Sequence, residues 1–405
     1  MNLKIHIKIA LAYFFIVALL GVFMRMFHVV DIEFNYKNIL HAHSHIALLG
    51  WIYTAITTLI YQLFLSDKQI DTSYKRLFWS TQISILGMLF TFPFTGYALL
   101  SIFFSTYFLL NTYVFVRLFL KHTSQEQKKT NSYKIIRAAL WFMVLSSIGP
   151  WALGIIMNTL GSTSPWYRNA IYFYLHFQYN GWFLVALIGI LFGVFERYSI
   201  PFPKKVFQLF IKLFISGVIL TFFLSILWMK PNFSFYILAG IGSIFQITAF
   251  GILGKQLKIH KEQLKVSLSK MEGILLKTAG LLFIAKLFFQ LIGSIPGISE
   301  MISNNLDIVI AYIHWIFLGI VTISLFAFLN HFKLFKISKR VYLIYLIAFI
   351  LTESLLFYKG MVIWLNVALV ENYYLFLCIA SSLFLIAISG LVLLQFQNKK
   401  KSIDY

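Results

Sequence analysis

Residues 38–51 read Asn-Ile-Leu-His-Ala-His-Ser-His-Ile-Ala-Leu-Leu-Gly-Trp, which places His41, His43 and His45 at the start of a long apolar segment. Burying an imidazole in lipid costs free energy unless the ring has a partner, so three together need an explanation. On a helix, His41 and His45 lie about 40° apart on one face, whereas His43 points the other way. Neutral imidazole is a good ligand for a metal ion or a haem iron, so this segment predicts such a site.

The spacing around His45 recurs twice along the chain. Glycine follows each histidine by five residues in the pairs His45 and Gly50, His176 and Gly181, and His314 and Gly319. The histidines are 131 and 138 residues apart, each close to one third of the 405 residues. This spacing predicts an internal repeat with units of about 1–133, 134–271 and 272–405. Glycine lets a large group approach a helix backbone, and a planar macrocycle is one such group.

The composition is that of a membrane protein. Apolar residues make up 60% of the chain, charged residues only 12%, and the mean hydropathy is +0.83. These values predict an all-α polytopic membrane protein. The lone cysteine, Cys378, excludes a disulfide framework, a cysteine-ligated iron–sulfur site and covalent c-type haem.

Apolar windows of about twenty residues predict twelve transmembrane helices in a single domain, residues 1–405. We expect them near 7–30, 39–65, 76–96, 97–120, 134–160, 169–194, 206–229, 232–254, 272–293, 308–330, 341–364 and 371–396. His45, His176 and His314 then lie near the outer ends of the second, sixth and tenth helices. We therefore expect three pseudo-repeated arcs of four helices.

The basic residues predict the orientation of the helices. With the amino terminus inside, 28 of the 34 Lys and Arg residues fall on the inner side, including Lys399, Lys400 and Lys401. This bias predicts a multi-pass protein of the cell membrane with both termini cytoplasmic. The net charge of +21 is therefore an orientation signal and a contact with the lipid bilayer, and we expect no nucleic-acid partner.

These features together resemble subunit I of the haem–copper oxidases, a superfamily that includes nitric-oxide reductases. Residues 307–319, Asp-Ile-Val-Ile-Ala-Tyr-Ile-His-Trp-Ile-Phe-Leu-Gly, are similar to the C-type branch, in which the position of His314 ligates the low-spin haem. Residues 174–183 are similar to the segment that supplies the first copper ligand. The resemblance implies a non-covalent b-type or related haem between His314 and either His41 or His45, with copper as a further candidate at His176. In a metal-handling protein, His43 and His176 would be the metal ligands.

Two departures from this pattern limit the predicted activity. Tyr312 stands where the family has the ligand of the active-site haem, and residues 206–229 contain no histidine where the family has two adjacent copper ligands. We therefore expect a bis-histidine haem that passes electrons to a membrane or extracytoplasmic partner, without the oxidase reaction.

Two alternatives stay open. His-Ala-His near the start of the second helix is loosely similar to the membrane haem–copper proteins of the nitric-oxide response, which implies a metal- or haem-handling protein. The second alternative is that the protein is a transporter without haem.

Other residues are candidates for the surroundings of the site. Trp51 flanks the histidines and could line a haem pocket, and the outer-side cations Arg25, Arg168 and Lys359 could hold haem propionates. Lys286 and Glu353 both fall near the middle of the membrane, where an unpaired charge is costly, so we expect a structural ion pair between them, with a proton path as the alternative.

Overall fold

The computed structural model describes residues 2–396, so residues 1 and 397–405, with Lys399, Lys400 and Lys401, lie outside the described residues. Within residues 2–396, twelve helices are long and apolar enough to cross a membrane. They lie where the sequence predicted them, and the largest differences, at Asp71 and Ile259, are five residues. The predicted all-α membrane fold with twelve spans is therefore confirmed.

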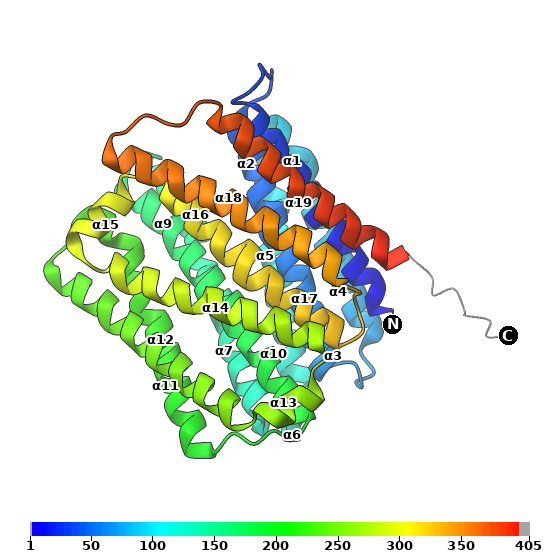
Figure 1. Cartoon of the computed structure of the whole chain (residues 1–405). Helices are drawn as coiled ribbons and strands as arrows, with labels where there is room; N and C mark the ends of the chain where they lie inside the picture. The colour runs from blue at the N-terminus through cyan, green and yellow to red at the C-terminus, as the bar shows by residue number, and fades with distance from the viewer. Residues whose placement is uncertain (1, 397–405) are drawn as a thin grey trace.

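Seven spans are single helices (Figure 1): α1 (Leu3–Met26), α4 (Asp71–Thr95), α5 (Leu99–His122), α12 (Phe233–Ile259), α14 (Lys270–Gly293), α18 (Lys339–Leu365) and α19 (Tyr373–Phe396). Five are composite: α2 (Tyr36–His45) with η1 (Ile46–Tyr53) and α3 (Thr54–Phe64); α7 (Asn131–Ser146) with α8 (Ile148–Thr159); α9 (Pro165–His176) with η2 (Phe177–Phe183) and α10 (Leu184–Arg197); α11 (Lys204–Leu220) with η3 (Thr221–Met229); and α16 (Leu306–His314) with η4 (Trp315–Val321) and α17 (Thr322–His331).

Short helices and polar caps join the spans. The connections contain α6 (Gln125–Lys129), α13 (Lys261–Ser267) and α15 (Pro296–Ser303). Asn35 begins α2, because its side chain accepts hydrogen bonds from the backbone N–H groups of Lys37 at 3.0 Å and Asn38 at 3.3 Å. Such caps satisfy the first backbone donors of a helix and fix where it starts.

The second, sixth and tenth spans form the centre of the bundle. Their most apolar windows are 83%, 83% and 56% buried, whereas no other span exceeds 44%. Side chains join each pair of these spans. The Trp51 indole N–H donates a hydrogen bond to the Thr322 hydroxyl at 3.0 Å. The ring centroids of Tyr53 and Trp182 are 6.4 Å apart, and those of Tyr179 and Phe317 are 6.0 Å apart. The three histidine-bearing helices therefore share one packed core.

Each central span widens into a π-helical segment directly after its histidine. These segments, η1, η2 and η4, begin one residue after His45, His176 and His314 and contain Gly50, Gly181 and Gly319. A Cβ atom on these glycines would lie 2.7–2.8 Å from Tyr13, Phe142 and Phe349 respectively. Aromatic side chains of neighbouring spans thus fill the place where the sequence suggested a macrocycle, so that reading of the glycines is wrong. π-Helical turns are frequent at functional sites.

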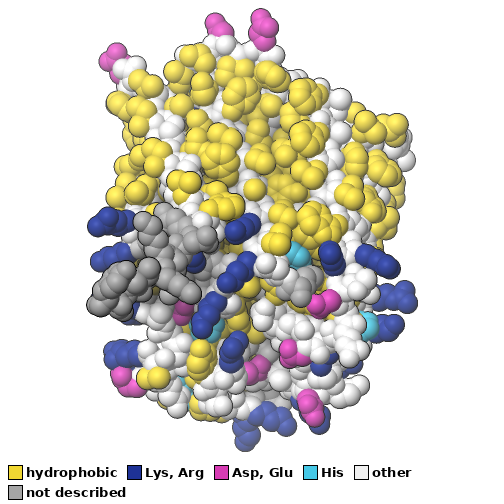
Figure 2. All heavy atoms as spheres, turned by 90° about the vertical axis from the view of Figure 1, so that its right-hand side faces the viewer, with side chains coloured by type: hydrophobic (Ala, Val, Ile, Leu, Met, Phe, Trp, Pro, Cys, Tyr) yellow, Lys and Arg dark blue, Asp and Glu magenta, His cyan; other side chains and the backbone are white. Residues whose placement is uncertain are grey.

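The surface divides into an apolar belt and a basic end. Figure 2 shows apolar side chains over the upper part of the molecule and Lys and Arg side chains gathered in the lower part. The belt matches the lipid-facing surface that the twelve spans require.

Candidate functional site

His43 of α2 and His314 of α16 lie close to each other. Their ring centroids are 6.4 Å apart, and their planes are inclined by 32°. Two imidazoles on opposite sides of one metal ion have centroids about 6 Å apart, because each metal–nitrogen bond is about 2 Å and each nitrogen lies about 1 Å from its ring centre. The pair therefore has the separation of two ligands to one metal ion.

The Nδ1 atoms of both rings are used in hydrogen bonds. His43 Nδ1 donates to the carbonyl oxygen of Val17 in α1 at 3.1 Å, and His314 Nδ1 donates to that of Ile310 at 2.8 Å. In a neutral ring this leaves the lone pair on Nε2. Metal-ligating histidines are oriented by such a bond from the other ring nitrogen, so both rings have the tautomer that a metal requires.

His41 and His45 lie on the other side of α2. The His45 ring packs 4.4 Å from Phe92, its Nδ1 donates to the carbonyl oxygen of His41 at 2.8 Å, and its Nε2 accepts from the Tyr97 hydroxyl at 3.4 Å. The His41 ring contacts Tyr97 at 4.7 Å. The structure thus brings His43, the residue predicted as a metal ligand, to His314, and gives His41 and His45 aromatic neighbours instead.

Two contacts position the histidine pair, one with α1 and one between the spans that contain α2 and α16. A Cβ atom on Gly21 of α1 would lie 3.2 Å from Cε1 of His43, so this glycine makes room for the ring. Trp51 and Thr322 lie eight residues after His43 and His314, and the Trp51 Nε1–H donates to the Thr322 hydroxyl at 3.0 Å. Trp51 is 1% exposed and stacks on Phe14. It therefore lies below the histidine pair as a link between the two spans.

Replacing Trp51 with phenylalanine should lower the stability of the protein by about 1 kcal/mol, because the buried Thr322 hydroxyl loses its indole donor. Thermal unfolding of the purified protein measures this loss. Trp166→Phe is the control, since Trp166 is 62% exposed. Equal melting temperatures for the two variants would contradict the structural role of Trp51.

Cations lie near the histidine pair at the end of the bundle where α1 ends. Arg25 interacts electrostatically with both His43 and His314 and has no ion pair among the described residues, whereas Lys359 pairs with Asp307 at 2.9 Å. His28 stacks on Tyr374 at 4.6 Å. Burial and then the positive charges of Lys359 and Arg25 lower the pKa of His28. Asp307 pairs with Lys359, and the charge of Arg25 also acts on Glu353, so both signs of charge lie at this end of the histidine pair. Arg25 is the cation there that could hold an anionic group.

The predicted ion pair between Lys286 and Glu353 is wrong. The Lys286 ammonium donates to the side-chain oxygen of Gln246 at 3.3 Å, and neither carboxyl oxygen of Glu353 has a hydrogen-bond partner among the described residues. The two residues lie on α14 and α18, and the packing turns their side chains to different neighbours.

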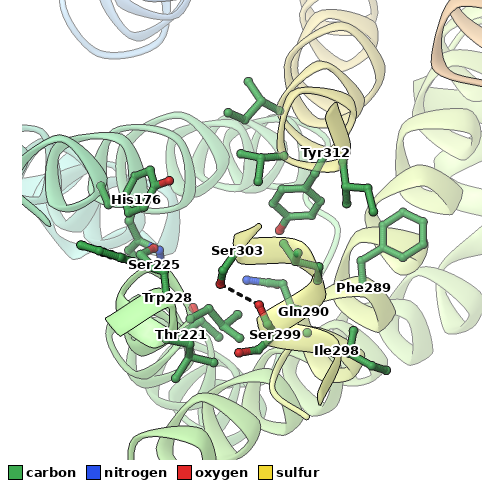
Figure 3. A pocket seen from close by; sticks show the side chains of 18 of the residues that line it. His176, Thr221, Ser225, Trp228, Phe289, Gln290, Ile298, Ser299, Ser303 and Tyr312 are labelled. Atoms are coloured by element: carbon green, nitrogen blue, oxygen red, sulfur yellow. Dashed lines mark hydrogen bonds between the residues drawn. The ribbon is translucent and has the colours of Figure 1, made fainter. Parts of the chain in front are cut away.

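A cavity of about 340 Å³ lies between α9, η2, η3, α14, α15, α16 and α18 (Figure 3). His176 borders it, but the ring's Nε2 donates to the carbonyl oxygen of Val218 at 2.9 Å and its Nδ1 accepts from Asn180 at 3.3 Å. Tyr312 points into the cavity. Arg168 also lines the cavity, and its Nε–H donates to the Tyr172 hydroxyl at 3.0 Å. Arg168, which the sequence predicted to bind the cofactor, therefore lies at the cavity and does not contact the histidine pair.

Gln290 and Ser299 line the same cavity and were not singled out from the sequence. The signal for Gln290 was present, because a polar side chain within an apolar span commonly marks a functional site. Ser299 gave no signal, since it lies in a connection between spans. Across residues 2–396, no three His, Cys, Asp or Glu side chains gather as a metal cluster.

Comparison with known proteins supports the fold. No protein-family model matches the sequence. No curated protein matches it. Among solved structures, the chain is similar to a haem–copper terminal oxidase dimer studied by cryo-electron microscopy, with a TM-score of 0.64 and 12% sequence identity over 98% of this chain and 84% of that chain. The protein is therefore a multi-pass membrane protein with the fold of a haem–copper terminal oxidase.

Proposed function

We propose that this protein is a membrane haem protein that holds one non-covalent b-type haem between His43 and His314 and transfers single electrons. The observation that carries the proposal is the 6.4 Å separation of two rings whose Nδ1 atoms both bond backbone carbonyls. The oxidase fold adds support, since haem and copper belong to the solved protein that shares it.

The two imidazoles, each with its Nδ1 on a backbone carbonyl, suit such a group as ligands. A haem iron with two histidine ligands accepts and releases one electron and keeps no open position for dioxygen. Electron transfer is therefore the proposed role, and dioxygen reduction is not. His43 replaces His41 and His45 as the proposed partner of His314, because the rings of His41 and His45 pack against Phe92 and Tyr97.

Arg25 is the proposed partner of the haem propionates. Its charge acts on both histidines, it is partly buried, and it has no ion pair within residues 2–396. Lys359 is already paired with Asp307, and Arg168 borders the cavity. A guanidinium binds a carboxylate through two parallel hydrogen bonds, which orients as well as attracts it.

Copper at His176 is not part of the proposal. The ring uses both nitrogens in hydrogen bonds to Val218 and Asn180, and a single histidine makes a poor copper site.

The reduced-minus-oxidised absorption spectrum of the purified protein tests the proposed function. We expect a sharp low-spin b-type difference spectrum and one haem per chain by extraction and pyridine haemochrome assay. A colourless preparation that binds copper would favour a metal-handling protein, and a colourless preparation that binds neither would favour a transporter; both results would contradict the proposal.

We propose that both termini lie in the cytoplasm, because positive residues favour the inner side of a membrane. In a Cys378→Ser background, a membrane-impermeant maleimide applied to intact cells should label Glu371→Cys, in the loop between α18 and α19. It should leave Lys265→Cys in α13 unlabelled until the cells are broken. The reverse pattern would contradict this orientation and move the histidine pair to the inner side.

A further inference from the structure

The cavity beside His176 is distinct from the histidine pair. It has a volume of about 340 Å³, within the range of sites that bind small organic molecules, and neither His43 nor His314 lines it. Figure 3 shows the side chains of Gln290 and Tyr312 directed toward its middle from two different helices.

The cavity contains polar groups without protein partners. Gln290 and Ser299 are each 4% exposed, and the side-chain oxygens of both lack a hydrogen bond among the described residues. No described residue hydrogen-bonds to the Tyr312 hydroxyl, which faces the same space. Buried polar groups are almost always paired in native proteins, so these groups indicate a ligand that both donates and accepts hydrogen bonds.

The remaining walls select an aromatic ligand. Trp228 and Phe289 lie on opposite sides of the cavity in Figure 3, and Trp228 is held by a 3.0 Å hydrogen bond to Asn169. Flat rings pack well against such side chains. Arg168, stacked 4.2 Å over Trp228, is the one charged residue among the described cavity-lining residues, which disfavours a cationic ligand.

We propose that this cavity binds a hydroxylated aromatic compound, with its hydroxyl on Gln290 and Tyr312 and its ring between Trp228 and Phe289. The side chains that line the cavity therefore make the region next to His176 a binding site for an organic ligand. The proposal does not depend on haem binding at His43 and His314.

Calorimetric titration of the purified full chain with 1-naphthol tests the proposal, with naphthalene as the probe that lacks the hydroxyl. 1-Naphthol should bind at least about tenfold more tightly than naphthalene. Gln290→Leu and Tyr312→Phe should each weaken 1-naphthol binding about fivefold or more and leave naphthalene binding unchanged, because each removes one hydrogen bond.

Gln82→Leu is the matched control. Gln82 is also a buried glutamine whose amide has no partner among the described residues, but it borders a cavity of only about 10 Å³. This variant should bind 1-naphthol as the original protein does. Equal binding of the two probes with no effect of Gln290→Leu or Tyr312→Phe would overturn the proposal, as would absence of 1-naphthol binding. A second haem per chain that is lost in Tyr312→Phe would also overturn it.

Discussion

The low-spin haem spectrum of the purified protein should disappear when His314 is replaced with alanine. His314 is one of the two rings at 6.4 Å, and its Nδ1 is fixed by the Ile310 carbonyl so that Nε2 is the ligating atom. Loss of an outer-shell partner alone weakens a metal site about 10–100-fold, so loss of a ligand should remove more than about 90% of the low-spin signal.

His45→Ala is the matched control for this variant. His45 makes the same local hydrogen bond, from Nδ1 to the carbonyl oxygen four residues earlier at 2.8 Å, but its ring packs against Phe92. The absorption spectrum of His45→Ala should therefore stay low-spin. A low-spin spectrum in His314→Ala, at unchanged haem content, would refute the assignment of His314.

Substituting Gly319 with alanine should destabilise the protein by about 1–3 kcal/mol, as overpacking of a tight core does. The new Cβ would lie 2.7 Å from Cζ of Phe349 and 3.0 Å from Leu282, and it would press on the π-helical segment that follows His314. Thermal unfolding of the purified variant measures the loss.

A second change separates this contact from a general effect of alanine. Phe349→Leu removes the atom that the new Cβ would strike, so the double variant should recover part of the stability lost by Gly319→Ala. Gly280→Ala in α14 should cost little, since a Cβ there meets nothing within 4 Å. Equal losses at Gly280 and Gly319 would show that the close approach is not the cause.

The number and position of the spans could be predicted because hydrophobic length alone determines them. A membrane-spanning helix needs about twenty apolar residues, and the sequence contains twelve such segments separated by short polar loops. The importance of the second, sixth and tenth spans could also be predicted, since histidines are costly in an apolar span and mark it as unusual.

The histidine that faces His314 could not be predicted from periodicity. The repeat pattern favoured His45, because it matches His314 in its distance to the following glycine. Matching spacing along the chain gives the depth of a residue in its span, but not which neighbouring helix its side chain meets. The direction of His43 is set by α1, through Val17 and Gly21, and the sequence gives no signal that these residues contact it.

The error at Lys286 and Glu353 has a similar origin. Depth in the membrane can be estimated from position in a span, but the direction of a side chain around the helix axis depends on its neighbours. The Lys286 side chain points toward Gln246 in α12. Depth in the membrane alone could not distinguish this direction from one toward Glu353 in α18.

Electron paramagnetic resonance of the oxidised protein tests most directly whether His43 and His314 share one haem iron. The original protein should give a low-spin ferric signal, and His43→Ala should convert it to a high-spin signal, because one of the two proposed histidine ligands is lost. His41→Ala and His45→Ala should stay low-spin. A low-spin signal that survives in His43→Ala and is lost in His41→Ala or His45→Ala would contradict the account.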